Sequence, residues 1–289
     1  MVAMEATSTP TSTREAARHL KEWLSQEPHL PNVEDEEWLE TVYRHNKCSL
    51  QKSKRKLENY FSMKTKYPNI LKNRDPTSAE ILEARKAYPV AYSSKRTRDN
   101  CRIMHMLWGP ETGTWDMDQI LKRNFMLHDV ICFREDPDTV GMYCITDLSG
   151  ITYQHIVKGL LGFRAVNEIM SAGYSERMKG TYYINAPHFM SSFMDILKSI
   201  LPKNMAERTS ILNSREEILS IFDEDVLSVD FGGNGPTFKD YEEWTQSVLE
   251  KHKSWLEEQE SYCSNEALRR RGKDELEEMS GSFMKLEVD

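Results

Sequence analysis

In the N-terminal part of the chain, apolar side chains recur every three or four positions, which is the spacing of an amphipathic helix. The pattern predicts helices over 14–26, 33–47 and 49–68, and a shorter helix near 78–87 after a linker at 69–78. The second helix has acidic residues in its first turn and basic residues in its last, as the helix dipole favours. We therefore expect residues 14–87 to form a small all-helical N-terminal domain.

Beyond residue 88 the pattern changes to short runs rich in β-branched and aromatic residues. These runs predict strands over 101–108, 140–148 and 180–186, and longer periodic segments at 115–133 and 152–172 predict the helices between them. Strands that alternate with helices favour parallel pairing with right-handed crossovers. We expect an α/β domain over 88–240, followed by a C-terminal helix and a charged tail over 241–289.

The segment 188–201 has more apolar positions than a helix lying on a sheet needs. Two apolar stripes lie about 100° apart on it, namely Phe189, Phe193, Ile196 and Ile200, and Met190, Met194, Leu197 and Leu201. One stripe would face the sheet, so the other must contact something else. Periodicity alone leaves two interpretations equal: a helix sunk between two layers, or a helix that walls a ligand site.

Composition and charge narrow the class of partner. The 289 residues are 39% hydrophobic and 29% charged, with a formal net charge of -8. This balance argues against a nucleic-acid partner, and any anionic partner must meet a local basic patch. No apolar run approaches the roughly 18 residues of a membrane-spanning helix, and residues 1–13 are rich in Ser, Thr and Pro without a secretory signal pattern. We expect a disordered leader over 1–13 and a cytoplasmic, monomeric protein.

The sequence lacks the usual catalytic and metal-binding signatures. Its eight histidines include no H-x-x-x-H pair, its five cysteines have no C-x-x-C spacing, and the nucleophile elbow, G-x-G-x-x-G and Walker motifs are missing. We therefore expect no metal, no cofactor, no disulfide framework and no enzymatic activity. Asp147 ends a predicted strand, where α/β folds often place functional groups, but a cap of the following turn is the favoured interpretation.

Several short motifs occur together in the second half of the chain. YINAP at 183–187, an apolar helix, ILP at 200–202, an arginine a few residues later and DFGG at 230–233 together resemble the CRAL-TRIO lipid-binding domain. With the preceding helical bundle, the resemblance covers residues 14–260. It implies a mixed, largely parallel sheet that floors an apolar cavity, with 188–201 as a mobile gate helix over it. Ser228 stands where many family members have proline, which implies a looser turn.

The resemblance also implies which residues wall the cavity. The corresponding positions are Leu121, Phe125, Met142, Ile151, Ile169, Met170, Tyr174, Thr181, Met190, Phe193, Met194 and Leu197. The set is rich in methionine, whose flexible side chain suits a long or polyene ligand. Taken singly, each residue fits ordinary core packing as well as ligand contact.

A second implication concerns charge. Family members that release cargo at phosphoinositide-bearing membranes carry a basic cluster beside the gate. Its positions here are Arg177, Lys179 and Arg208, with Lys203 next to the Asn204 that replaces a fourth basic residue. Such a cluster would bind a polyphosphate headgroup, and the alternative is a solvated surface.

The resemblance favours a non-enzymatic carrier that exchanges a retinoid, carotenoid, tocopherol or similar lipid with membranes through transient contact. The alternative is a regulatory or scaffold protein that uses the same module to bind proteins or phosphoinositides.

Overall fold

The computed structural model describes residues 12–108, 115–175, 177–201 and 203–269. Most of the predicted leader, residues 1–11, and the last part of the predicted charged tail, residues 270–289, lie outside the described residues. Both remain predictions.

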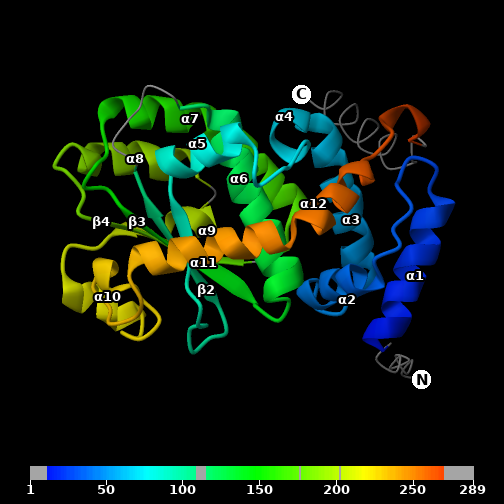
Figure 1. Cartoon of the computed structure of the whole chain (residues 1–289), viewed down its shortest axis with the longest axis horizontal. Helices are drawn as coiled ribbons and strands as arrows, with labels where there is room; N and C mark the ends of the chain where they lie inside the picture. Colours follow the sequence, from blue (N-terminus) through cyan, green and yellow to red (C-terminus); the bar gives the residue numbers. More distant parts are fainter. Residues whose placement is uncertain (1–11, 109–114, 176, 202, 270–289) are drawn as a thin grey trace, which may run out of the picture.

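Helices gather at the N-terminal end of the chain (Figure 1). They are α1 (Thr13–Gln26), α2 (Glu36–His45), α3 (Leu50–Lys66), α4 (Pro68–Leu71) and α5 (Ala79–Ala87). Ser12, Asp35 and Ser49 each accept a hydrogen bond from a first-turn N–H of the helix that follows, which is the role of an N-cap. Trp38 is buried at the centre of this unit, and its ring stacks on Tyr262 from the C-terminal segment at 6.1 Å. The periodic pattern predicted α1, α2, α3 and α5 to within a few residues, whereas α4 extends into the stretch that was predicted to be a linker.

The second part of the chain forms a five-stranded sheet with the order β1-β2-β3-β4-β5. The strands are β1 (Val90–Tyr92), β2 (Arg102–Leu107), β3 (Gly141–Asp147), β4 (Arg177–Ile184) and β5 (Thr209–Ile211). Strands β2 to β5 run parallel, and β1 is antiparallel to β2, so the mixed, largely parallel sheet is confirmed. The sequence did not predict β1 and β5, because three residues carry no measurable period.

Helices cover both faces of this sheet. They are α6 (Met117–Val130), α7 (Tyr153–Gly173), α8 (Met190–Ile200), α9 (Lys203–Ala206), α10 (Arg215–Ile221), α11 (Phe238–Lys251) and α12 (Lys253–Glu258). Alternation along the strands sends Ile103 and Ile145 to one face, where they pack with Phe222 and Tyr241 from the α10 and α11 region. The opposite face lies under α6, α7 and α8, and it carries the site described below.

The turn around Ser228, where the resemblance implies a looser turn, is held by hydrogen bonds to neighbouring residues. Ser228 is fully buried, and its side chain accepts a hydrogen bond from the Asp230 N–H at 3.2 Å. Its own backbone N–H donates to His105 Nε2 at 3.4 Å. Proline has no N–H, so a proline at position 228 could not donate this bond to His105 of β2.

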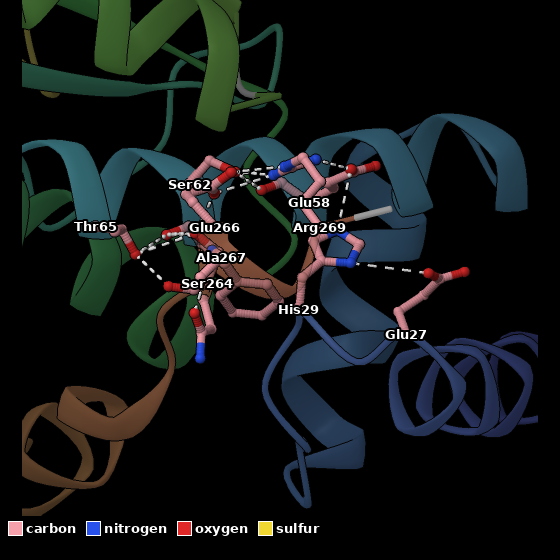
Figure 2. A network of polar contacts seen from close by, with 11 residues as sticks. Glu27, His29, Glu58, Ser62, Thr65, Ser264, Glu266, Ala267 and Arg269 are labelled. Atoms are coloured by element: carbon pink, nitrogen blue, oxygen red, sulfur yellow. Dashed lines mark hydrogen bonds and ion pairs between the residues drawn. The ribbon is translucent and has the colours of Figure 1, made fainter. Parts of the chain in front are cut away.

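Residues after α12 return to the N-terminal helices. The backbone N–H of Asn265 donates to the carbonyl of His29 at 2.8 Å. Arg269 donates to Glu58 and to Ser62, the latter at 2.7 Å. Figure 2 shows Glu58 between Arg269 and the ring of His29. This C-terminal segment is therefore anchored as far as Arg269.

Candidate functional site

A cavity of about 360 Å³ lies between the sheet and helices α6, α7 and α8. Strand residues such as Met104, Met142 and Met178 form its floor, and helix residues such as Phe125 and Phe163 form its sides. Eight of the lining residues are methionines. The volume falls within the range of about 300–1,000 Å³ that is typical of small-molecule sites, and flexible thioethers suit an apolar guest.

The structure brings nine of the twelve predicted wall residues together on this cavity. They are Leu121, Phe125, Met142, Ile151, Met170, Thr181, Met190, Phe193 and Leu197. Ile169, Tyr174 and Met194 are buried but lie outside the cavity wall. Ile169 packs in the core shared with the N-terminal helices. The family resemblance gives backbone positions, and the side chains at these three positions do not line the cavity.

Tyr174 belongs instead to a buried polar cluster at the end of α7. Its hydroxyl donates to Asp129 Oδ1 at 2.6 Å, while Tyr60 and Arg74 bond Asp129 Oδ2 at 2.8 and 2.6 Å. Burial, together with the neighbouring Asp129 carboxylate, raises the pKa of Tyr174 well above its ordinary value, so Tyr174 stays a hydrogen-bond donor. The cluster ties α3 and the segment of Arg74 to α6 and α7, and so holds the cavity's helical wall in place.

Helix α8 is apolar on two sides, but the stripes divide differently from the prediction. Met190, Phe193 and Leu197 line the cavity, so Phe193 joins the inner face. Phe189 and Ile196 point outward and are 46% and 57% exposed. On α7, Tyr153, Val157 and Leu160 are also exposed apolar residues. The two helices that cover the cavity therefore both present apolar side chains to the outside.

The cavity wall is predominantly apolar. Burial raises the pKa of the Cys144 thiol to about 12. The lining residues within the described chain include no lysine, arginine, aspartate or glutamate. Such a wall suits an uncharged molecule, because burying an unpaired charge is unfavourable.

A second hollow, of about 500 Å³, adjoins the turn between α2 and α3. Seven cationic side chains line this basic groove, namely Arg44, Lys47, Lys52, Arg55, Lys56, Arg177 and Lys179. Asp138 is the one acidic residue among its described lining. Lys47 and Cys48 both adopt left-handed backbone conformations, which turn the chain from α2 into α3 and bring these cations to the start of β4.

Two of the four predicted headgroup residues, Arg177 and Lys179, line the basic groove. Lys203 begins α9, and Arg208 donates to the carbonyl of Met178 at 3.3 Å; neither lines the groove. The five cations from α2 and α3 were missed, although the run at 52–56 is a visible charge cluster, because sequence separation hides their approach to β4.

Lys179 already has an acidic neighbour. Its ammonium lies 3.0 Å from Asp99 Oδ2, which also accepts from the Tyr143 hydroxyl at 3.0 Å. Burial alone would raise the pKa of Asp99, but hydrogen bonds from Thr97, Lys179 and Tyr143 outweigh it and lower the pKa to about 2. Asp99 is thus an anion that competes with any ligand for Lys179.

Asp147 ends β3 and contacts the turn that follows. Asp147 Oδ1 accepts from the Ser149 N–H at 2.7 Å, so its interpretation as a turn cap is confirmed. Within the described residues, no three His, Cys, Asp or Glu side chains are grouped as metal ligands. Among the described helices, none has both the length and the apolar character needed to cross a bilayer.

Comparison with known proteins gives two matches to domain families. The sequence profile of the CRAL/TRIO domain matches residues 88–233, and a profile described as "Pinta-like, UBA domain" matches residues 9–81. The gap between them, residues 82–87, lies within α5. The crystal structure of Sfh5 is similar with a TM-score of 0.58 and 11% sequence identity, covering 86% of this chain and 99% of that chain. At that identity the likeness supports the fold alone.

Proposed function

Because the chain belongs to the CRAL/TRIO family, whose fold is one of lipid binding and transfer, we propose that it is a non-enzymatic cytoplasmic carrier of one hydrophobic molecule. The observation that carries this proposal is the apolar cavity of about 360 Å³ beneath α7 and α8. Burial of a few hundred Å² of ligand at about 25 cal/mol per Å² leaves several kcal/mol of affinity after the costs of binding. Shielding the cargo from water requires no bond to be made or broken.

The cavity volume favours a small cargo. The space of about 360 Å³ holds roughly a dozen to eighteen carbon atoms if each occupies about 20–30 Å³. A single-chain lipid fits this range, and a retinoid slightly exceeds it. Tocopherol, a full-length carotenoid and a two-chain phospholipid all exceed it clearly.

The outer surface of α7 and α8, the helices that cover the cavity, supports exchange with membranes. Phe189 and Ile196 on α8 are exposed, and inserting them between lipid headgroups would bury apolar area that water now contacts. The same insertion would draw α8 away from the cavity and open a path for the cargo. We therefore propose that α8 is the gate.

Guidance to the membrane by phosphoinositides is supported by the basic groove. Seven cationic side chains line this groove although the whole chain has a net charge of -8, so the positive charge is concentrated at the groove. The guanidinium group of arginine can donate two hydrogen bonds to one phosphate, and the ammonium group of lysine adds a compact positive charge, so together they suit a polyphosphate headgroup. We place the headgroup between Arg55 of α3 and Arg177 of β4, which extends the predicted cluster to the N-terminal helices.

Extraction of the purified protein with organic solvent, followed by mass spectrometry, tests the carrier function. We expect close to one lipid per chain, either co-purified or taken up from vesicles of mixed lipids. Failure to recover lipid after expression in several hosts and after incubation with such vesicles would contradict it.

A charge-reversal series tests phosphoinositide guidance. Arg55→Glu with Arg177→Glu should weaken binding to phosphoinositide vesicles at least tenfold and leave cargo binding unchanged. Lys86→Glu with Lys239→Glu, at exposed lysines of α5 and α11 outside the basic groove, is the matched control because it changes the net charge equally. Equal weakening by the control would show that only net charge matters.

The regulatory or scaffold alternative predicts a shallow or side-chain-filled cavity. The volume of about 360 Å³ does not favour that alternative.

A further inference from the structure

Three nitrogen-bearing rings lie against one another on the cavity wall. Trp108 follows β2, Trp115 precedes α6, and His155 lies in the first turn of α7. Their ring centroids are 5.2 Å apart for Trp108 and Trp115, 5.0 Å for Trp108 and His155, and 4.5 Å for Trp115 and His155. All three residues line the cavity. The stack therefore places three nitrogen-bearing rings side by side on a mostly apolar wall.

The hydrogen bonds at the start of α7 set the tautomer of His155. The backbone N–H of Thr152 donates to His155 Nδ1 at 2.9 Å, which completes a capping box. A ring nitrogen that accepts a hydrogen bond carries no proton, so the proton of the neutral ring is on Nε2. Burial lowers the pKa of His155, with a further contribution from the Lys158 charge, which keeps the ring neutral. His155 thus contributes an N–H donor, as each tryptophan does.

Among the described residues, these three donors have no acceptor. Within the described part of the chain, Trp108 Nε1, Trp115 Nε1 and His155 Nε2 are buried and have no hydrogen-bond partner. Native proteins rarely leave a buried donor unpaired, and three such donors in one stack point to an acceptor supplied from outside the chain. The cavity on which these residues lie is where an outside molecule would sit.

We propose that the cargo carries an uncharged carbonyl oxygen, and that the N–H groups of Trp108, Trp115 and His155 bind it. This inference rests on the carrier function proposed above and specifies the chemical class of the cargo. A carbonyl oxygen accepts hydrogen bonds and donates none, which matches a cluster that only donates. A hydroxyl group would need an acceptor for its own proton, and none of these three rings supplies one. A carboxylate would need a counter-charge, and the described cavity wall includes no lysine or arginine.

A thermodynamic cycle on the full-length protein tests the assignment. The two probes are 2-tridecanone and tridecane, which have the same chain length, and the variants are Trp108→Phe and Trp115→Phe, which keep an aromatic ring but lose the N–H. We expect each variant to weaken binding of the ketone about three- to tenfold, and to change binding of the alkane by less than about twofold. Comparing each probe with itself removes the difference in solvation between ketone and alkane. Trp23→Phe, in α1 and outside the cavity wall, is the matched control.

Infrared spectroscopy of the unaltered protein gives a second test that does not depend on a variant folding. The carbonyl stretch of ketone labelled with carbon-13 should shift to lower frequency on binding, relative to its value in alkane solvent. An unshifted stretch, or equal weakening of ketone and alkane by the variants, would overturn the carbonyl assignment and leave the carrier function standing. Failure of both probes to bind would overturn the carrier function as well.

Discussion

Filling the cavity from α7 should remove cargo binding without unfolding the protein. Gly159 lies within α7 and lines the cavity. A Cβ at this position would meet Trp108 Cη2 at 3.9 Å, an ordinary van der Waals contact, so a side chain is tolerated sterically at its base. Gly159→Leu would extend a branched side chain from that point beside the cavity.

The expected magnitude follows from the volumes. Leucine adds four carbon atoms, which occupy roughly 100 Å³ at about 25–30 Å³ each, or more than a quarter of the space of about 360 Å³. A bound chain would lose contact over three or four methylene groups, at about 0.8 kcal/mol each. The loss of about 2.5–3 kcal/mol corresponds to roughly a 100-fold weaker Kd. Replacing glycine within a helix should meanwhile raise the free energy of unfolding by about 0.5–1 kcal/mol.

Gly159→Ala is the matched control, because it gives the same helix stabilisation with little added volume. We would measure displacement of a fluorescent polyene from each variant, and urea unfolding by circular dichroism. Both variants should be at least as stable as the natural chain, and only Gly159→Leu should lose binding. If Gly159→Leu binds cargo as tightly as Gly159→Ala, the ligand does not occupy this cavity.

Three other perturbations address the remaining features. Burial lowers the pKa of His105 to about 3, so below pH 6.5 the unfolded chain takes up a proton that the folded chain does not. The free energy of unfolding should therefore fall as the pH drops from 6.5 toward 3, by up to about 1.4 kcal/mol per pH unit from this group. His105→Gln should flatten that slope in urea titrations, and an unaltered slope would contradict the assignment. Asp99→Asn should free Lys179 and tighten binding to phosphoinositide vesicles about two- to fivefold in a flotation assay; weaker binding would show that Asp99 positions Lys179 rather than competing for it. Arg269→Ala removes the bonds to Glu58 and Ser62 and should lower the free energy of unfolding by about 1 kcal/mol. Limited proteolysis should then cleave the C-terminal segment faster, and equal cleavage rates would argue against the anchor.

Long elements were predictable from the sequence because each carries several periods of its own pattern. The helix predicted over 14–26 is α1, and the strand predicted over 140–148 is β3. The strand predicted from 180 starts at Arg177, because a charged, exposed strand entry lacks the apolar signal. Short elements such as β1 depend on pairing with β2, which a local pattern does not reveal.

The site was predictable only as far as motifs fix backbone positions. The motifs around Met190 and Leu197 placed α8 over the cavity, as in the structure. The direction of the Tyr174 side chain, in contrast, depends on its hydrogen bond to the buried carboxylate of Asp129. The basic groove joins α3 to β4, which are more than a hundred residues apart along the chain. The stack of tryptophans on His155 likewise requires three elements to meet, and only the folded chain shows it.

Photolabelling locates the cargo most directly. A single-chain lipid that carries a diazirine near its apolar end would be bound to the full-length protein, irradiated, and mapped by peptide mass spectrometry. The carrier account predicts labels on inward residues such as Phe125, Met142 and Phe193, and their loss in Gly159→Leu. Labels confined to the outward residues Phe189 and Ile196 would show a lipid on the surface and contradict a cavity that carries it.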